Sequence, residues 1–159
     1  MDCQKQKWIV DMKKLGIYPG SFDPFHTGHL DIVKQAQQVF DEIVVIRAIN
    51  PDKETPVSKL PENFLNQMGV SVNTHKGLVT DFVKAYENRE YSVTLVRGLR
   101  SGNDLAYEQN LIAFMRQMHP YLRVVFFLCD PKYQHISSSA LRGIRRFSEE
   151  EYKKYALEG

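Results

Sequence analysis

The chain has few cysteines, no long apolar run and almost no excess of charge. Its 159 residues include two cysteines, Cys3 and Cys129, too far apart in the sequence for metal-binding or redox spacing. We expect a free terminal thiol and a buried strand residue, consistent with a reducing cytosol. No run reaches the roughly 18 apolar residues of a membrane span, and no signal peptide precedes the fold. These absences predict a cytoplasmic protein with no membrane partner.

The charge balance excludes a second class of partners. Lys and Arg number 21 against 19 Asp and Glu, which gives a net charge of +2. That excess is too small to indicate nucleic-acid binding, so any basic residues that matter must be clustered locally. Hydrophobic residues make up 43% and charged residues 25%, an ordinary globular balance. Residues 1–13 are interpreted as an N-terminal extension, and residues 14–159 as a single domain with a short C-terminal helical segment.

Two common catalytic motifs are also missing. The chain has no Gly-x-x-x-x-Gly-Lys-Ser/Thr sequence, which argues against a P-loop fold. It has no Gly-x-Ser-x-Gly elbow either, so nothing supports a serine hydrolase of the α/β type.

The pattern that is present alternates strand-like apolar runs with helical segments. This order predicts an α/β fold, namely a Rossmann-like doubly wound five-stranded parallel sheet with helices on both faces. In such sheets, ligands bind beyond the carboxyl ends of the strands, where the strand order reverses. The expected strands are Leu15–Tyr18, Glu42–Ala48, Val70–Thr74, Val93–Val96 and Arg123–Leu128; the expected helices are Gly28–Phe40, Pro61–Met68, Leu78–Asn88, Asp104–Met118, Ser138–Arg146 and Glu149–Leu157.

The segment between the first strand and the first helix is the most informative. It reads Tyr-Pro-Gly-Ser-Phe-Asp-Pro-Phe-His-Thr-Gly-His and carries two imidazoles, His26 and His29, three residues apart. Backbone N–H groups at a helix N-terminus carry partial positive charge and attract phosphate. An imidazole at that position adds a movable donor for a phosphoryl oxygen. The segment therefore predicts nucleotide chemistry.

The segments after the other strands carry further cations and hydroxyls. If the fold is correct, they share one edge of the sheet and could line a polyphosphate site. They are Ser21, His26 and His29 after the first strand, Asn50–Lys53 after the second, Arg97–Arg100 with Asp104, Tyr107 and Glu108 after the fourth, and Tyr133–Ser139 after the fifth.

Each group also has a plainer interpretation. The histidines could cap or pack, and as metal ligands they would supply two at most. Lys53 could be a solvated loop lysine, and the arginines could pair with Asp104 and Glu108 in a surface network of little energetic value. The serines Ser137–Ser139 form a common N-cap arrangement. The nucleotide interpretation is preferred because the plainer interpretations of all four groups would have to be correct at the same time.

These segments together resemble the nucleotidyltransferase superfamily that carries a His-x-Gly-His signature, here His26-Thr27-Gly28-His29. Within it, Arg97-Gly98-Leu99-Arg100 followed by Asp104 and Tyr107-Glu108 is similar to the bacterial pantetheine-phosphate adenylyltransferase family. The resemblance covers most of residues 14–145. It implies transfer of the adenylyl group of ATP to 4′-phosphopantetheine, which gives dephospho-coenzyme A and pyrophosphate.

The resemblance also implies roles for individual residues. His29, Lys53 and Arg97 would be catalytic. Phosphopantetheine would contact Ser21, Lys53, Val79 and Arg97, and ATP would contact Ser21, Phe22, His26, His29, Gly98, Leu99, Arg100, Glu108, Tyr133, Gln134, His135, Ile136, Ser137, Ser138 and Ser139. The family further implies Mg²⁺ on the ATP phosphates without protein side-chain ligands, a homo-oligomer (a hexamer) and feedback by coenzyme A.

Some features depart from that family. The stretch from Lys53 to Phe82 is short and is interrupted by Pro56, Pro61 and Gly69. The run Ser138-Ser139-Ala140-Leu141-Arg142 is closer to a nicotinamide-nucleotide adenylyltransferase pattern, and His26 points the same way. The alternatives are therefore a nicotinamide-mononucleotide adenylyltransferase, a cytidylyltransferase acting on a small phosphoalcohol, and a nucleotide sensor without catalysis.

Overall fold

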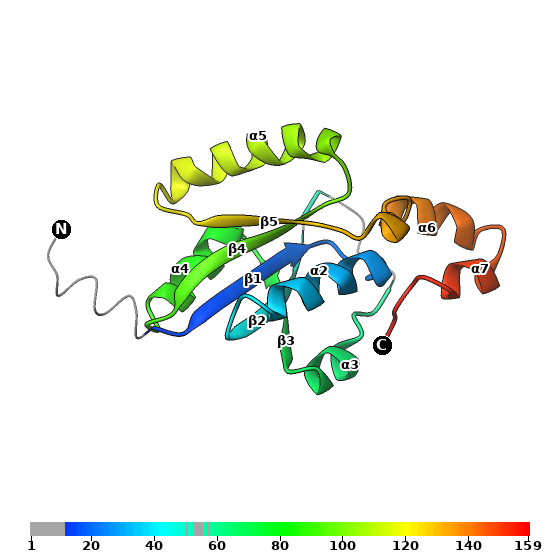
Figure 1. Cartoon of the computed structure of the whole chain (residues 1–159), viewed down its shortest axis with the longest axis horizontal. Coiled ribbons are helices and arrows are strands. Elements are labelled where there is room, and N and C mark those ends of the chain that lie inside the picture. Colours follow the sequence, from blue (N-terminus) through cyan, green and yellow to red (C-terminus); the bar gives the residue numbers. More distant parts are fainter. Residues whose placement is uncertain (1–11, 50, 53–55, 57) are drawn as a thin grey trace, which may run out of the picture.

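The computed structural model describes residues 12–49, 51–52, 56 and 58–159. Strands and helices alternate along most of this length (Figure 1). In chain order the elements are β1 (Lys14–Gly20), α2 (Thr27–Gln37), β2 (Glu42–Ile49), α3 (Glu62–Gln67), β3 (Val70–Lys76), α4 (Val79–Glu87), β4 (Ser92–Leu99), α5 (Gly102–Met118), β5 (Val124–Leu128), the 3₁₀ turn η1 (Pro131–Tyr133), α6 (Ser138–Arg145) and α7 (Glu149–Lys153).

The described strands form one parallel sheet in the order β3-β2-β1-β4-β5. From β1 the chain moves outward through β2 to β3, then returns to place β4 on the other side of β1. The order therefore reverses between β1 and β4, which makes their carboxyl ends the expected ligand site. The predicted fold class is confirmed.

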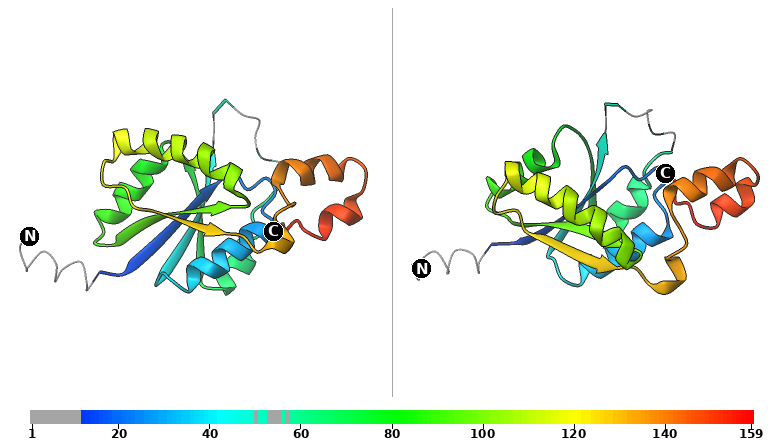
Figure 2. Two further views of the ribbon diagram at one scale, coloured as in Figure 1. Left: turned by 45° about the horizontal axis from the view of Figure 1, so that its top comes forward. Right: turned by 90° about the horizontal axis from the view of Figure 1, so that it is seen from above.

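Two apolar layers hold helices against opposite faces of the sheet (Figure 2). Successive residues of a strand point to opposite faces. In β2, Ile43 and Val45 accordingly join the layer with α2 and α3, whereas Val44 and Ile46 join the layer with α4 and α5. Most core residues of both layers are almost completely buried. The sheet is therefore a rigid support for the loops at its carboxyl edge.

The predicted strands and helices all exist, with small differences at their ends. The last helix was predicted too long: α7 ends at Lys153, and a turn at Lys154 and Tyr155 follows it. Ala156 forms an antiparallel bridge with His26, and Leu157 N–H donates to Phe25 O at 2.8 Å. The C-terminal tail also accepts Thr27 N–H at Tyr155 O, 3.0 Å away, and so pairs with the β1–α2 loop.

The helices α6 and α7 lie beyond the carboxyl ends of the strands and pack on each other around Tyr152 (Figure 1). Among the described residues, no helix combines the length and apolarity needed to cross a membrane. Residues 1–11 of the predicted extension lie outside the described residues. We propose that residues 14–159 form one domain, because the described elements share one sheet and its covering helices.

Candidate active site

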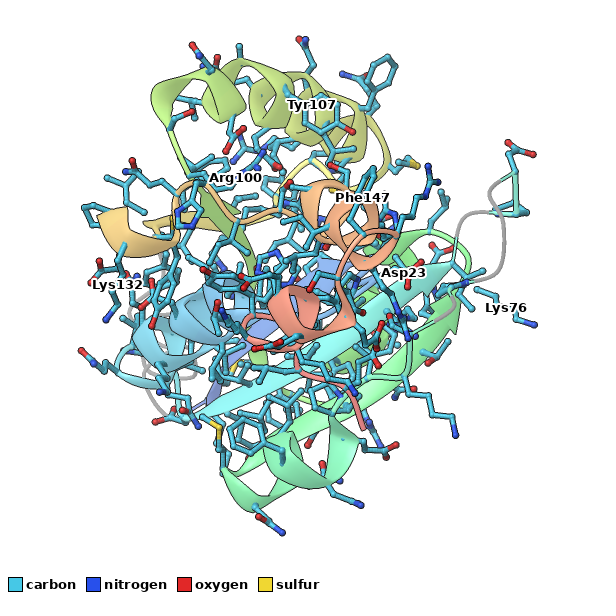
Figure 3. All side chains as sticks on the ribbon, turned by 90° about the vertical axis from the view of Figure 1, so that its right-hand side faces the viewer. Asp23, Lys76, Arg100, Tyr107, Lys132 and Phe147 are labelled. Carbon is cyan, nitrogen blue, oxygen red and sulfur yellow. The ribbon has the colours of Figure 1, made fainter. Side chains whose placement is uncertain are left out.

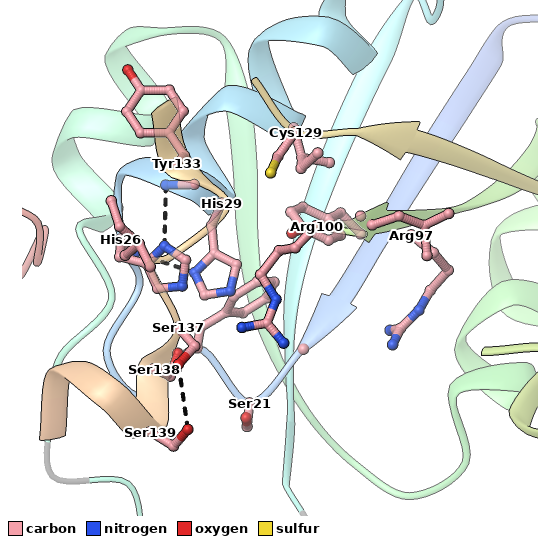
Figure 4. Close-up of a pocket in the computed structure, with 18 of the residues that line it drawn as sticks. Ser21, His26, His29, Arg97, Arg100, Cys129, Tyr133, Ser137, Ser138 and Ser139 are labelled. Carbon is pink, nitrogen blue, oxygen red and sulfur yellow. Dashed lines mark hydrogen bonds between the residues drawn. The ribbon is translucent and has the colours of Figure 1, made fainter. Parts of the chain in front are cut away.

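A cavity of about 560 Å³ opens at the reversal point between β1 and β4 (Figure 4). Its walls come from the β1–α2 loop, the end of β4 and the segment that leads into α6, which is the convergence expected from the sequence. The lining residues are Tyr18, Pro19, Gly20, Ser21, Phe22, His26, Gly28, His29, Ile32, Arg97, Gly98, Leu99, Arg100, Tyr107, Cys129, Tyr133, Ile136, Ser137, Ser138, Ser139 and Arg142.

The two histidines cap the first turn of α2 reciprocally. His26 is the N-cap residue, and its Nδ1 accepts the N–H of Gly28 at 3.1 Å. His29 reaches back, and its Nδ1 accepts the N–H of His26 at 3.2 Å. A ring nitrogen that accepts an N–H cannot carry a proton, so each neutral imidazole holds its proton on Nε2. Both rings therefore present an Nε2–H donor.

Burial keeps both rings neutral. It lowers the pKa of His29 well below its usual range, and His26, Arg100 and Arg97 lower it further because they disfavour another positive charge. Burial, with a smaller effect from Arg100, lowers the pKa of His26 to about 4. Neutral imidazoles cannot attract phosphate by net charge. They can donate a hydrogen bond to an oxygen on which negative charge develops.

The start of α2 differs from the sequence-based expectation in one respect. The first-turn N–H groups were expected to be available to phosphate. Thr27 N–H instead donates to Tyr155 O at 3.0 Å, and Gly28 N–H donates to His26. These internal bonds satisfy donors that a bare helix end would leave to a ligand. The side chain of His29 is consequently the more important donor at this position.

Arg97 forms a buried ion pair with Glu108. Its Nε and Nη2 donate to the two carboxylate oxygens at 2.7 and 2.8 Å, and its Nη1 donates to Pro19 O at 3.0 Å. The side chains are 17% and 8% exposed. This bidentate pair is not the surface network considered as an alternative. Three of the five guanidinium N–H groups are engaged with described residues, which leaves two for a ligand.

Arg100 and α6 form the opposite wall. Arg100 is partly exposed and extends towards the His29 ring (Figure 4), with Asp104 paired to it at 3.4 Å. At the start of α6, Ser137 caps the helix by accepting Ala140 N–H at 3.1 Å. Ser138 Oγ donates to Pro24 O at 2.9 Å, which ties α6 to the β1–α2 loop. The N-cap interpretation of Ser137 is thus confirmed, and the cap lies at the cavity.

Some predicted site residues do not line this cavity. Glu108 lies behind Arg97, and Gln134 and His135 are exposed on the preceding loop. Val79 instead lines a second, largely apolar hollow of about 330 Å³ with Ile49, Leu78 and Phe114. Lys53 and Asn50 lie outside the described residues. The remaining predicted residues for ATP and acceptor binding all line the first cavity.

Sequence reasoning also missed several lining residues. Tyr18 and Ile32 were assigned no role, and Cys129 was interpreted only as a buried strand residue. Tyr107 and Arg142 were noted in motifs but assigned no role. The signal available for Arg142 was its fixed distance from the serine run, because one helical turn places both on the same side of α6.

Among the described residues, no group of three or more His, Cys, Asp or Glu side chains could hold a metal ion. The arrangement instead brings cationic and N–H donors around a polar cavity. Such a site can bind phosphate oxygens and stabilise negative charge that moves between them.

The chain is similar to known proteins over most of its length. Residues 17–144 match the family model described as cytidylyltransferase-like. A phosphopantetheine adenylyltransferase from Clostridium tetani is 35% identical over 139 residues, which cover 84% of each chain. One from Leptospira biflexa is 33% identical over 143 residues, which cover 85% of this chain and 86% of the relative. The chain belongs to the phosphopantetheine adenylyltransferase family. As a member of that family it is a nucleotidyltransferase.

Solved structures of more distant proteins share the fold. The nicotinic acid mononucleotide adenylyltransferase of Plasmodium falciparum aligns with a TM-score of 0.57 at 17% identity, covering 91% of this chain and 90% of that one. A bifunctional NMN adenylyltransferase/ADP ribose pyrophosphatase from Francisella tularensis aligns with a TM-score of 0.56 at 14% identity, covering 84% of this chain and 42% of that one. At these identities the likeness extends to the fold alone.

Proposed function

We propose that the protein transfers the adenylyl group of ATP to 4′-phosphopantetheine, which gives dephospho-coenzyme A and pyrophosphate. The family membership carries this proposal, since the relatives are matched over 84% of both chains. The cavity supports it independently. A polar hollow bordered by three arginines, two Nε2–H donors and the start of α6 suits a nucleoside triphosphate better than an uncharged ligand.

The chemistry requires no general base. A phosphate monoester has its second pKa near 6, so most of the acceptor is a dianion at neutral pH and can attack phosphorus directly. The difficulty is to bring two anions together while charge accumulates on the α-phosphoryl oxygens and the leaving pyrophosphate. Positioning and electrostatic stabilisation then supply most of the catalysis.

His29 is proposed to donate Nε2–H to an α-phosphoryl oxygen. Its Nδ1 is held by His26 N–H, which fixes both the tautomer and the ring orientation. A neutral donor adds little to ground-state binding but strengthens as charge grows on the oxygen. The Nε2–H of His26 is proposed to reach the ATP phosphates beside it.

Arg100 and the start of α6 are proposed to hold the β- and γ-phosphates. Arg100 reaches into the cavity with part of its side chain exposed, as a residue that binds a ligand from solution requires. The β1–α2 loop with Ser21 and Phe22, the end of β4 with Gly98 and Leu99, and the loop from Tyr133 to Ser139 would contact the rest of the nucleotide. Glu108 would act through Arg97 rather than on ATP.

Arg97 and Lys53 are proposed to hold the acceptor phosphate. Arg97 has two N–H groups that no described residue accepts, and it is fixed in direction by Glu108 and Pro19 O. The hollow lined by Val79 is apolar and suits the pantetheine arm. We expect Lys53→Ala to raise the KM for phosphorylated acceptors; equal losses with unphosphorylated acceptors would contradict that role.

Mg²⁺ is proposed to enter with ATP, held by phosphate oxygens, since the described residues offer no cluster of metal-binding side chains. The ion would neutralise part of the phosphate charge. The cytoplasmic location stays a prediction from the composition, and the homo-oligomer and feedback by coenzyme A stay predictions from the family resemblance.

The deciding experiment is an acceptor panel scored by pyrophosphate release. Purified protein is supplied with ATP or CTP and with 4′-phosphopantetheine, nicotinamide mononucleotide, nicotinate mononucleotide or a small phosphoalcohol. We expect turnover with ATP and 4′-phosphopantetheine to exceed every other pair by orders of magnitude. Preference for a mononucleotide or for CTP would contradict the proposal, and ATP binding without pyrophosphate release from any acceptor would indicate a sensor.

The second candidate is a nicotinamide- or nicotinate-nucleotide adenylyltransferase. Arg142 favours it, because this residue completes the serine-arginine pattern and lines the cavity. The same panel separates the two, since they share ATP and differ only in the acceptor.

A further inference from the structure

A buried arginine lies behind the nucleotide loop and outside the cavity. Arg47 belongs to the carboxyl end of β2 and is only 8% exposed. Its Nε donates to Ser21 O at 3.0 Å, its Nη1 donates to Ser58 O at 2.8 Å, and its Nη2 donates to Phe22 O. One guanidinium therefore holds three backbone carbonyls from two separate segments of the chain.

The loop that Arg47 holds has an unusual backbone. Phe22 has a φ of +46°, in the left-handed region that residues with a side chain seldom adopt. Such a conformation persists only where the surroundings impose it. Arg47 binds the carbonyls of Ser21 and Phe22, one on each side of the strained φ. No other described side chain donates to both of these carbonyls.

The conformation of Phe22 affects the catalytic candidates directly. Its ring packs edge-on against His29, with ring centroids 4.9 Å apart and planes at 88°. It also packs against Tyr18 at 5.1 Å. A change in the Phe22 backbone would move a wall of the cavity and the ring against which His29 rests.

The same network joins the nucleotide loop to the segment that follows Lys53 in the sequence. Asp23 Oδ1 accepts from Ser58 N at 3.1 Å and from Ser58 Oγ at 2.6 Å. On its other side Asp23 O accepts from Arg142 of α6, and Figure 3 shows Asp23 beside that helix. Arg47 and Asp23 thus link the nucleotide loop to Ser58, which lies five residues after Lys53, the residue proposed to hold the acceptor phosphate.

We propose that Arg47 is a positioning residue, which fixes the Ser21–Phe22 backbone for ATP and couples it to the acceptor side of the site through Ser58. The part of this inference that concerns the acceptor rests on the proposed function. The part that concerns ATP does not, because any adenylyl transfer would require an ordered nucleotide loop. Removing the donor of a buried carbonyl also lowers the stability of the whole protein. The test must therefore separate an effect on loop position from an effect on folding.

The first test replaces Arg47 with Met and with Lys. In Arg47→Met we expect the KM for ATP to rise by about tenfold or more, the loss expected when a hydrogen bond to a charged donor is removed. Arg47→Lys should lie between Met and wild type, since an ammonium cannot reproduce the planar fork. Arg116→Met is the matched control, because Arg116 also donates to a carbonyl, Leu122 O, but lies away from the cavity.

Chemical rescue distinguishes positioning from general destabilisation. Arg47 borders a second polar hollow of about 760 Å³, so a small cation has a route to its place. In Arg47→Ala, guanidinium at roughly 10 mM, far below the molar range that unfolds proteins, should lower the KM for ATP several-fold. Sodium chloride at equal ionic strength should not, and guanidinium should not rescue His29→Ala.

Two results would overturn the inference: a wild-type KM for ATP in a folded Arg47→Met or Arg47→Ala variant, or a raised KM that guanidinium does not lower. If the Met variant does not fold, Arg47→Lys decides, and an unchanged KM in that variant counts against the inference. ATP binding is measured by calorimetry on the same proteins. The acceptor panel can reject 4′-phosphopantetheine while Arg47→Ala still binds ATP more weakly than wild type and guanidinium restores ATP binding. In that case the proposed function fails and the role of Arg47 stands.

Discussion

The imidazole rings of His26 and His29 stack with their centroids 3.7 Å apart and their planes at 25°. Each ring accepts a backbone N–H through Nδ1, so the pair is locked in one tautomer at the start of α2. Two protonated rings at this separation would repel each other; His26 is also buried and His29 partly buried. The two stacked rings therefore act as neutral hydrogen-bond donors. The effects expected from substituting His29 and His26 follow from this neutrality.

Replacing His29 by Ala should reduce kcat by about a hundredfold or more and leave ATP affinity largely intact, because the lost donor acts on charge that develops in the transition state. The measurements are pyrophosphate release at saturating substrates and ATP titration by calorimetry. His119→Ala serves as the control, since His119 pairs with Glu87 at 2.8 Å and does not line the cavity. Weakened ATP binding with unchanged turnover would refute the role.

The pKa of His26 makes stability depend on pH in the acid range. Folding lowers this pKa from 6.5 to about 4. Between these values the unfolded chain holds a proton that the native state does not, so stability falls as pH falls, by about 1.4 kcal/mol per pH unit for this residue. His26→Asn keeps an N-cap acceptor without a titrating ring and should flatten that slope.

Urea unfolding of both proteins at intervals from pH 4.5 to 8 gives the comparison. Above pH 7 the ring is neutral in both states, so the two curves should run parallel there, which provides an internal control. A variant that loses stability in acid as steeply as wild type would show that His26 does not titrate as described.

The Arg97–Glu108 pair should behave as a unit. Arg97→Met leaves a carboxylate buried without a partner and should cost about 3–5 kcal/mol of unfolding free energy. Adding Glu108→Leu removes that charge and should restore most of the loss, although the double variant should still bind acceptor poorly. Denaturation of the four proteins in the cycle, together with the acceptor KM, provides the test. Additive stability losses would mean that the two groups do not interact.

The sequence predicted the architecture because its signals are local. The continuous apolar run Ile43–Ile46 indicates a strand that is buried on both faces, and the Pro-Gly pair before His26 marks the end of β1. The convergence of Ser21, Arg97, Arg100 and Ser137 then followed from the rule that parallel strands end at one edge.

The rest depends on contacts that no local pattern encodes. Arg47 lies in an apolar run, and only the bend of the β1–α2 loop brings two carbonyls to it. The bridge from Ala156 to His26 joins opposite ends of the described chain. Glu108 was assigned to ATP by resemblance, whereas its side chain is directed at Arg97. In each case, a long-range pairing decides the role.

The spacing between α2 and β4 gives the last prediction. A Cβ at Gly98 would meet Ile32 Cγ1 at 2.9 Å, so the Ile32 side chain must shift, and we expect α2 and His29 to move with it. Gly98→Ala should therefore cost about 1–3 kcal/mol of stability, as overpacking does, and lower kcat as well.

Gly143→Ala is the matched control: a Cβ there meets nothing within 4 Å, and α6 should gain about 0.5–1 kcal/mol. Thermal unfolding and pyrophosphate release measure both effects. Because the clash acts through Ile32 and removes no donor, Ile32→Ala, which removes the clashing Cγ1, should recover part of the lost kcat in the Gly98→Ala background. A double variant no more active than Gly98→Ala would place the defect elsewhere.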